Sequence, residues 1–423
     1  MPTDSRRRVL IVSHFFPPHG GGGVHRVLAW TRHLPSFGWD VTVLAAGRAG
    51  YWIHDDSLLA RVPPDTEVRR VDALTGVVLW RRALGGGQRE GGARRDDSLR
   101  ALARFFLFPD SYAAWQRPAI AAGLERVASG GIDCVLSTSP PETAHLVGER
   151  IARGLPWVAD FRDPWVGLHY RRPPTPFHAA RHRAAERRVL ERADRVLCAS
   201  RTHYEAVRQV AGDRARFLPN GIELEAERAE KGESPARDGR LTVVSTGSHV
   251  DMPALFALLE ALAARVQRDP GIAQRLRFVL AGPHDAALSR LVEARGLQAM
   301  VTFAGILPHA EARALQRSAD RLLYVRNEGP GYGAMVPGKT YEYLDARRPV
   351  VALVAESEAA GILREAGAFV VAPDQAEAAL DALLARNEQA PRPDEGAIAR
   401  ILGPRSRRAL AGELAGILSE LCP

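Results

Sequence analysis

The chain has 423 residues, 46% of them hydrophobic and 25% charged, which is the composition of an ordinary globular protein long enough for two domains. Its net charge of +8 arises in the first half, and the basic segments lack the interleaved aromatics and reading motifs of nucleic-acid-binding proteins. No apolar run is long enough to span a membrane, residues 1–16 read as a strand and not a signal peptide, and three cysteines without metal-binding spacing favour a reducing cytoplasm.

Short apolar segments alternate with helical patterns along the whole chain. Segments rich in β-branched residues and bounded by turn residues predict buried parallel strands, and stretches with one apolar face predict the helices between them. The predicted strands are residues 8–15, 40–46, 133–139, 157–163, 195–200, 241–247, 276–282, 301–305, 320–326, 349–355 and 368–372. The predicted helices include residues 23–38, 142–154, 252–270, 339–346 and 377–387.

This order of elements predicts an α/β protein with two Rossmann-like, doubly wound parallel sheets. Residues 223–240 are charged, contain Gly, Pro and Ser, and lack periodicity, as an interdomain linker should. We therefore expect a first domain over 1–222, a second over 241–400, and a C-terminal helix over 401–423 that is able to pack back on the first domain. The Gly- and Arg-rich stretch 81–98 is expected to be a mobile surface loop.

A glycine-rich loop, "SHFFPPHGGGGVHR", joins the first predicted strand to a helix that begins at about Val24. Backbone N–H groups in such a turn can approach a phosphate or a sugar, and the helix N-terminus adds partial positive charge. The pattern is not GxGxxG with an acidic residue about 20 positions on, so a dinucleotide site is poorly supported. His14 and His19 flank the loop, and each suits a structural hydrogen bond as well as a catalytic role.

Two further polar segments, "STSPP" at 137–141 and "ADFRDPW" at 159–165, follow predicted strands. In an open parallel sheet, ligands sit at the carboxyl ends of the strands, so both segments face the same edge. For Arg162 and Asp163, a role in the site and a network that holds the loop are equally good interpretations. For Asp160 the structural interpretation is favoured.

The segment "MVPGKTYEYL", residues 335–344, carries one of only two lysines in a chain with 57 lysines and arginines. A cation at a helix N-terminus is disfavoured unless an anion binds there too. The loop before it is rich in Gly and Pro, and Glu342 lies one turn after Lys339 on the same helix face. The lysine and the backbone N–H groups suit a diphosphate, and the carboxylate suits ribose hydroxyls. The alternative is an exposed Lys339–Glu342 ion pair.

Together, the glycine-rich loop, "FLPNGIE", "FVLAGP", "VTFAG" and "VPGKTYEYLDARRPVVAL" resemble the retaining glycosyltransferases of family 4, which have the GT-B fold. The resemblance spans nearly the whole chain, and the order of the motifs is more specific than any one of them. "STSPP" followed by "ADFRDPW" further resembles a bacterial branch that mostly builds cell-surface or secreted polysaccharides. The resemblance implies that the nucleotide-sugar donor binds the C-terminal domain and the acceptor the N-terminal one, with the chemistry in the cleft between.

The resemblance also implies roles for individual residues. Glu342 matches the second glutamate of the family's E-x7-E motif, which implies ribose binding, and Lys339 is implied to lie near the donor diphosphate. Gly21 to Gly23 match the loop that approaches the donor phosphates and the acceptor. Arg162 falls where many relatives have a histidine near the reacting sugar.

The residues expected in the site fall into five groups. The catalytic group is Arg162, Asp163 and His14. The diphosphate ligands are Lys339, Gly338, Thr340, Arg326, Gly22 and Gly23, and the ribose and base ligands are Glu342, Gly305 and Pro283. The donor sugar is expected to contact Glu328, Gly333, Ala334 and Met335, and the acceptor to contact Ser139, His19 and Trp165.

The sequence departs from the E-x7-E pattern. The first glutamate would lie eight positions before Glu342, where this chain has Ala334. The donor sugar's hydroxyls must therefore be held otherwise, by Glu328 or by backbone of the loop 329–335.

The family's basic pair after the first strand of the second domain is also missing. The sequence there is "STGSHVDMP", with Ser248 and no Lys or Arg. Neutralisation of the diphosphate then falls on Lys339, with help from Arg326. These losses leave room for an inactive or regulatory relative.

We therefore expect a retaining, metal-independent glycosyltransferase that moves a sugar from a nucleotide diphosphate sugar to an acceptor hydroxyl, in the synthesis of cell-surface or secreted glycans or glycoconjugates. No cofactor is expected beyond the nucleotide sugar as co-substrate, and the acceptor is a glycan, a lipid-linked molecule or a small molecule. The protein is expected in the cytoplasm, and its basic first half is compatible with peripheral contact on the inner face of a membrane. The alternatives are a GT-B nucleotide-sugar 2-epimerase and a non-catalytic GT-B binding subunit.

Overall fold

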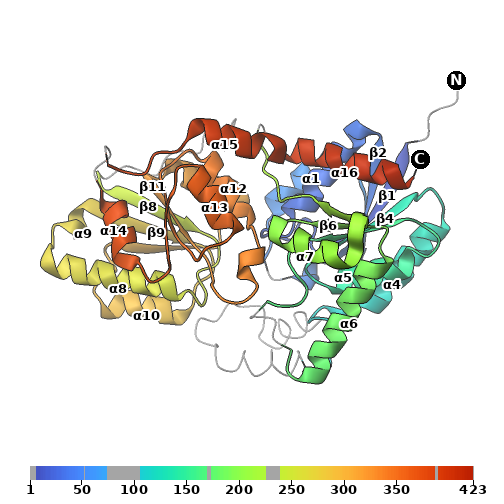
Figure 1. The fold of residues 1–423 in the computed structure, drawn as a ribbon, viewed down its shortest axis with the longest axis horizontal. Coiled ribbons are helices and arrows are strands. Elements are labelled where there is room, and N and C mark those ends of the chain that lie inside the picture. Colours follow the sequence, from blue (N-terminus) through green and yellow to red (C-terminus); the bar gives the residue numbers. More distant parts are fainter. Residues whose placement is uncertain are drawn as a thin grey trace. The chain divides into compact units, whose positions relative to one another are not determined.

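The computed structural model describes residues 6–51, 53–73, 105–168, 173–224, 239–385 and 389–422. The chain forms two compact units, one made of Met1–Asn220 with Arg407–Pro423 and the other of Gly221–Ser406 (Figure 1). The predicted mobile loop 81–98 lies outside the described residues, and so do residues 225–238 of the predicted linker.

The first unit is built on a parallel sheet that has, within the described residues, seven strands in the order β3-β2-β1-β4-β5-β6-β7. The order reverses between β1 and β4, and the carboxyl ends of these two neighbours flank the point where an open sheet accommodates a ligand. The strands are β1 Arg7–Val12, β2 Trp39–Ala46, β3 Glu67–Val71, β4 Cys134–Ser139, β5 Trp157–Phe161, β6 Arg195–Cys198 and β7 Ala215–Phe217. The flanking helices are α1 His25–His33, α4 Gln116–Ala128, α5 Thr143–Ile151, α6 Pro176–Arg192, α7 Arg201–Ala211 and α16 Arg407–Leu421.

Apolar side chains cover both faces of this sheet. Leu10 of β1 belongs to the buried cluster on one face, and Ile11 belongs to the cluster on the other, as the alternation of a strand requires. Leu414 of α16 completes the second cluster together with Trp30 and Trp39. The last helix of the chain therefore packs beside α1 and is part of the core of the first unit (Figure 1).

The second unit repeats the architecture with, among the described residues, a parallel sheet of six strands in the order β10-β9-β8-β11-β12-β13. Here the order reverses between β8 and β11. The strands are β8 Leu241–Thr246, β9 Leu276–Ala281, β10 Val301–Gly305, β11 Arg321–Val325, β12 Val350–Leu353 and β13 Phe369–Val371. The helices are α8 Pro253–Arg268, α9 Ile272–Arg275, α10 Ala286–Ala294, α11 His309–Ser318, α12 Gly338–Asp345, α13 Glu358–Glu365, α14 Ala376–Leu384 and α15 Glu395–Leu402.

The two sheets confirm the predicted fold class, and every predicted strand has a counterpart. Two edge strands, β3 and β7, were absent from the prediction. The sequence of β3 is "EVRRV", in which no residue is fully buried, and β7 is only three residues long. Edge strands of this kind lack the continuous apolar run by which the central strands are found.

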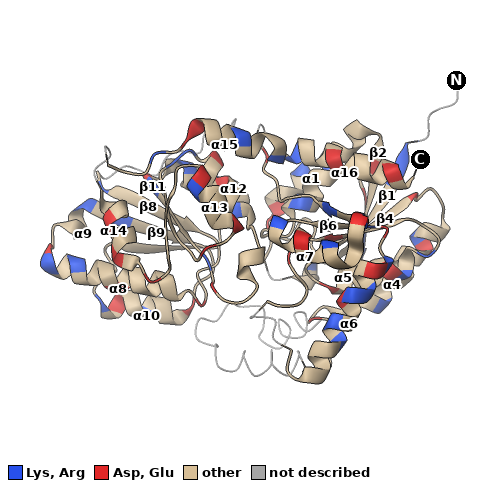
Figure 2. Cartoon of the chain, viewed as in Figure 1, with Lys and Arg blue, Asp and Glu red and all other residues tan. Residues whose placement is uncertain are grey.

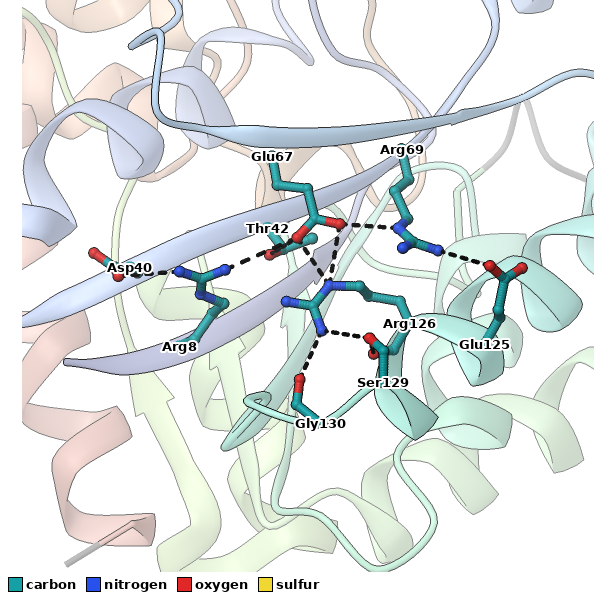
Figure 3. Close-up of polar contacts among 9 residues, drawn as sticks. All are labelled: Arg8, Asp40, Thr42, Glu67, Arg69, Glu125, Arg126, Ser129 and Gly130. Carbon is teal, nitrogen blue, oxygen red and sulfur yellow. Dashed lines mark hydrogen bonds and ion pairs between the residues drawn. The ribbon is translucent and has the colours of Figure 1, made fainter. Parts of the chain in front are cut away.

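A charged network joins the strands at the amino edge of the first sheet to α4 (Figure 3). Glu67 accepts hydrogen bonds from Arg69 Nε at 2.9 Å, Arg126 Nε at 2.8 Å and Thr42 Oγ1 at 3.1 Å. Partial burial acts to raise the pKa of Glu67, but the hydrogen bonds from its partners outweigh burial and lower the pKa. The network fastens the edge of the sheet opposite to the carboxyl ends of the strands.

Candidate functional site

The glycine loop follows β1 at the switch point of the first sheet. Gly21 has a φ of +82°, a conformation that side chains rarely adopt. Gly22 is exposed, and a Cβ added there would meet nothing within 4 Å. Gly23 is crowded, because a Cβ there would lie 3.1 Å from Nη1 of Arg162 and 3.3 Å from Cδ2 of Phe15. The backbone of the loop is therefore exposed at Gly22, and at Gly23 it packs against the guanidinium of Arg162.

Arg162 holds three backbone segments together. Its Nε donates to the Ser139 carbonyl at 2.9 Å, Nη2 donates to the Pro140 carbonyl, and Nη1 donates to the Gly23 carbonyl. The side chain is buried, and burial lowers the pKa of Arg162, against the nearby charges of Asp160 and Asp163 that act to raise it. Of the predicted catalytic residues, Arg162 is thus brought to the glycine loop with Asp163 beside it.

Asp160 pairs with Arg26 of α1 and not with Arg162. Its carboxylate accepts Arg26 Nη2 at 2.8 Å and Nε at 3.1 Å, together with the hydroxyl of Thr138 at 2.7 Å. Arg26 also donates to the carbonyls of Leu218 at 2.8 Å and Pro219 at 2.6 Å. This buried pair joins α1, β5 and the segment that follows β7, which is a structural role.

His14 and His19 lie beneath the loop, and neither is exposed. Each ring is anchored through Nε2, His14 to the Gly50 carbonyl at 3.3 Å and His19 to the Gly47 carbonyl at 3.1 Å. Burial lowers the pKa of His14 to about 3 and that of His19 to about 4, so both are neutral at pH 7. We assign the proton to Nε2, which donates to the carbonyl.

Aromatic rings surround His14 and the neighbouring Phe15, and sequence reasoning missed three of them, Tyr51, Tyr112 and Trp115. The ring centroid of His14 lies 4.4 Å from that of Tyr112 and 5.0 Å from that of Trp115, while Phe15 and Tyr51 are 4.5 Å apart. Burial raises the pKa of Tyr51, and Arg162 acts in the opposite direction. Tyr51 and Tyr112 come from loops without periodic patterns, so no local signal in the sequence pointed to them.

The two predicted acceptor-side residues beyond His19 are both buried. The hydroxyl of Ser139 forms a hydrogen bond with His145 Nε2 at 2.8 Å, and the hydroxyl of Ser137 forms one with His145 Nδ1 at 2.9 Å. Trp165 is 3% exposed and donates from Nε1 to His182 Nδ1 at 3.0 Å. The indole of Trp165 therefore lies in the core of the first unit, and the hydroxyl of Ser139 is hydrogen-bonded to the buried His145.

Asp110 is a further polar residue at this edge that the sequence analysis did not find. It accepts the backbone N–H and the hydroxyl of Thr143, both at 2.8 Å, at the start of α5. Burial, followed by the charge of Glu142, raises the pKa of Asp110 to about 6. Asp110 precedes Thr143 by 33 residues, so the contact follows only from the fold.

In the second unit, Lys339 lies at the switch point between β8 and β11. Its Nζ donates to the carbonyl of Val325, the last residue of β11, at 2.5 Å and lies 4.8 Å from the centroid of the Tyr324 ring. A Cβ added to Gly247, which follows β8, would lie 3.7 Å from the same nitrogen. Burial and the charge of Arg326 lower the pKa of Lys339 from 10.5 to about 8.

Arg326 directly follows β11 and is 5% exposed. Its Nη1 donates to the Met335 carbonyl at 2.9 Å, and its buried Nε has no hydrogen-bond partner in the part of the chain that the structure describes. Within those same residues, neither Arg326 nor Lys339 forms an ion pair with a carboxylate. Two neighbouring cations are therefore held at the start of α12 by carbonyl oxygens. Thr340, the residue after Lys339 in the helix, is buried, and its hydroxyl forms a hydrogen bond of 2.9 Å with the hydroxyl of Tyr324.

Glu342 is anchored from α11, which sequence reasoning did not foresee. One carboxylate oxygen lies 3.2 Å from His309 Nε2, and the other accepts Gln316 Nε2 at 3.1 Å. Burial acts to raise the pKa of Glu342, but His309, Arg313 and Gln316 outweigh burial and hold the pKa far below its usual value. The carboxylate is therefore ionised and oriented by two partners, and the ion pair with Lys339, which was the alternative interpretation of this segment, does not form within 4 Å.

The residues predicted for the donor sugar lie in the loop between β11 and α12. Glu328 accepts the backbone N–H of Ala355 at 2.8 Å, so one carboxylate oxygen is engaged with the chain itself. Gly333 and Ala334 belong to a short 3₁₀ turn, Tyr332–Ala334.

The residues predicted for the base follow β9 and β10. Gly282 donates its N–H to the Gly305 carbonyl at 2.6 Å, and a Cβ on Gly282 would lie 1.9 Å from the Gly247 carbonyl oxygen. The Pro283 carbonyl accepts the N–H of His249 at 2.8 Å. These contacts bring the predicted base ligands, Pro283 and Gly305, to the same edge as Gly247, which adjoins Lys339.

Models of two glycosyltransferase families match the chain over most of its length. The model described as "Glycosyl transferase 4-like domain" matches residues 21–221, and the model described as "Glycosyl transferases group 1" matches residues 240–386. The chain is a GT-B glycosyltransferase. Each of its units is matched by its own model, in the order in which they follow along the chain.

Solved structures match this glycosyltransferase over nearly its whole length. The N-terminal domain of Candida albicans trehalose-6-phosphate phosphatase is 13% identical, with a TM-score of 0.64 over 99% of this chain and 97% of that one. Sucrose-phosphate synthase from Thermosynechococcus elongatus is 15% identical, with a TM-score of 0.63 over 98% and 99%. Anabaena Alr3699/HepE in complex with UDP-glucose is 15% identical, with a TM-score of 0.64 over 98% and 100%. No curated protein sequence matches the glycosyltransferase.

The described part of the glycosyltransferase contains no helix that combines the length and the apolar character needed to cross a membrane. In the same residues, no three His, Cys, Asp or Glu side chains are grouped as they would be to hold a metal ion. Lys339, Arg326 and Glu342 are charged groups at the switch point of the second sheet.

Proposed function

We propose that this glycosyltransferase moves a sugar from a nucleotide diphosphate sugar to an acceptor hydroxyl, with retention of configuration and without a metal ion. The observation that carries the proposal is the pair of cations at the start of α12. Within the described residues, Lys339 and Arg326 have no carboxylate at ion-pair distance, and Arg326 lowers the pKa of Lys339. The charge of Glu342 acts on Lys339 in the opposite direction but does not form an ion pair with it, and two cations held together without a paired carboxylate favour a site for an anion.

The proposed anion is the diphosphate of the donor. As the bond between sugar and diphosphate breaks, negative charge builds on the leaving phosphate oxygen, and groups already fixed around it stabilise the transition state. Lys339 supplies a full charge there, because with a pKa of about 8 it is mostly protonated at pH 7 and a bound phosphate raises its pKa further. Arg326 supplies a second charge, and the N–H groups at the start of α12 supply the helix dipole.

Glu342 is proposed to bind the ribose of the donor. Each of its carboxylate oxygens receives one hydrogen bond, from His309 or from Gln316, and keeps acceptor capacity for a sugar hydroxyl. Because both partners come from α11, the carboxylate is already oriented before the nucleotide arrives, which reduces the entropy lost on binding.

No protein side chain is needed as the base in this mechanism. The leaving phosphate oxygen takes the proton of the acceptor hydroxyl on the same face of the sugar from which it departs, which gives retention. His14, neutral and buried under the glycine loop, is then an anchor for the loop. The acceptor is proposed to bind the first unit, where the open backbone at Gly22 and the aromatic Tyr51 lie at the switch point. Synthesis of a cell-surface or secreted glycan or glycoconjugate is the proposed context.

A non-catalytic binding subunit is a second candidate, and one observation favours it. Ala334 stands where the E-x7-E motif has its first glutamate, and the nearby Glu328 is already bound to the Ala355 N–H. A protein that binds the nucleotide but no longer binds the donor sugar would show this combination.

The test begins with a thermal-shift screen of UDP, GDP, ADP and dTDP, in which UDP comes first because the HepE complexes contain UDP and UDP-glucose. The donor sugars of the stabilising nucleotide are then assayed for hydrolysis and transfer, and the anomeric configuration of the product is read by NMR. Turnover with retention supports the enzyme. Tight binding without turnover supports the binding subunit, and a protein that no nucleotide stabilises would overturn both.

A further inference from the structure

A cavity lined by arginines lies in the first unit, away from the strand ends that carry the candidate site. Its volume is about 140 Å³, and its lining consists of Glu149, Arg150, Arg153, Arg188 and Arg192. Helices α5 and α6 each start at the carboxyl edge of the sheet and return to its amino edge. The cavity lies at their C-terminal ends, and therefore at the edge opposite to Arg162 and the glycine loop. Figure 2 shows the blue segments along α6 that include its arginines.

The charges around the cavity do not balance. Glu149 is 4% exposed at its side chain, and its two oxygens accept one hydrogen bond each, from Arg188 Nη2 at 2.9 Å and from Arg192 Nη1 at 3.0 Å. Arg150 and Arg153 form no ion pair or hydrogen bond with any residue that the structure describes. The four arginines are exposed, and one carboxylate offsets only one of their charges, so three positive charges gather around one cavity that is open to solvent.

The dipoles of two helix C-termini account for part of this charge. A C-terminus carries roughly half a negative elementary charge and attracts one cation within its last turn. Two such ends offset about one of the three unbalanced charges. The remainder repel one another across a space of about 140 Å³, which is well above the roughly 30 Å³ that a water molecule occupies in the liquid.

We infer that the cavity is a binding site for a phosphate group, separate from the donor site. The planar fork of a guanidinium matches phosphate oxygens bidentately, and several forks around one cavity suit a tetrahedral anion. Glu149 orients Arg188 and Arg192 through its two hydrogen bonds. Arg150 and Arg153 supply positive charge that is not paired with a carboxylate among the described residues. The phosphate comes either from a soluble phosphate compound or from the headgroup of an anionic lipid, since both present the same chemistry.

The test is made in a Lys339→Ala background, which removes one of the two cations of the proposed diphosphate site from every protein compared. The melting temperature is measured with inorganic phosphate and with sodium chloride at matched ionic strength. The double variant Arg150→Gln/Arg153→Gln, called the cavity pair, removes two charges from the cavity. The double variant Arg183→Gln/Arg187→Gln, called the control pair, removes the same charge from α6 outside the cavity. We expect phosphate to stabilise the parent and the control pair, and the cavity pair to need at least tenfold more phosphate for the same shift.

The inference would be overturned if phosphate stabilised the cavity pair and the control pair equally, or if phosphate did not raise the melting temperature of the parent. Folding of the cavity pair is checked by its melting temperature in chloride, which should match or exceed that of the parent because two mutually repelling charges are gone. The source is then identified with vesicles of phosphatidylcholine alone and with phosphatidic acid. If the parent sediments with the vesicles that contain phosphatidic acid and Arg150→Gln/Arg153→Gln does not, the ligand is a lipid headgroup. If the parent binds free phosphate but not these vesicles, the ligand is a soluble phosphate compound.

Discussion

Arg162 and Gly23 are in direct contact, since the guanidinium donates to the Gly23 carbonyl and a Cβ on Gly23 would lie 3.1 Å from its Nη1. The same side chain binds the Ser139 carbonyl at 2.9 Å. One buried cation therefore connects the ends of β4 and β5 to the glycine loop. The position of the loop depends on the absence of a side chain at residue 23 and on the presence of a guanidinium at residue 162.

Gly23→Ala is expected to destabilise the first unit by about 1–2 kcal/mol, because the new methyl group crowds Arg162 and Phe15 in a packed region. Gly22→Ala is the matched control, since a Cβ there meets nothing within 4 Å, and its effect should stay within about 0.5 kcal/mol. Urea unfolding of both variants measures the difference. Equal destabilisation by the two substitutions would show that the contact with Arg162 does not limit residue 23.

Asp160→Asn should cost about 3–5 kcal/mol of stability, because it leaves Arg26 buried without its counter-charge. Replacing both partners, as in Arg26→Met/Asp160→Leu, should recover part of that loss. Glu67→Gln in the half-exposed network of Figure 3 is the comparison, with an expected cost of about 1 kcal/mol. Chemical denaturation of the four proteins tests the order. A small effect of Asp160→Asn would mean that water reaches the Arg26 guanidinium.

Much of this architecture was predictable from the sequence, because each central strand is a short, buried apolar run. The position of Lys339 in the first turn of a helix was also predictable, since a loop of Gly and Pro precedes it. What supports the site was not predictable. His309 and Gln316 hold Glu342 from a different helix, and Tyr51 reaches the glycine loop from another connection. Contacts between distant segments leave no periodic signal in the sequence and appear only when the sheet brings the segments together.

Lys339→Met is expected to stabilise the protein in the absence of nucleotide by on the order of 1–3 kcal/mol at pH 7. Folding lowers the pKa of Lys339 from 10.5 to about 8, so burying the charged form destabilises the fold. That penalty is fully present below pH 8 and disappears as the pH rises through 10.5. The advantage of Lys339→Met should therefore shrink between pH 8 and pH 10.5. A variant less stable than the parent at pH 7 would show that Lys339 is a structural residue.

Glu342→Gln should make the protein less sensitive to acid. The folded protein holds the pKa of Glu342 far below its usual value, so the stability from its ionised form is present above the unfolded pKa of about 4.3 and is lost as the pH falls below it. Stability measured from pH 7 down to pH 3 should fall more steeply for the parent than for Glu342→Gln. Parallel curves would contradict the role assigned to His309 and Gln316.

The central claim is that Lys339, together with Arg326, neutralises the diphosphate of a donor, and calorimetric titration tests it most directly. The nucleotide that stabilises the protein best is titrated at pH 7 as its diphosphate and as its monophosphate. We expect the parent to prefer the diphosphate by at least tenfold, and Lys339→Ala to lose that preference. Lys231→Ala, at the only other lysine in the chain, should keep it. An unchanged preference for the diphosphate in Lys339→Ala would contradict the account.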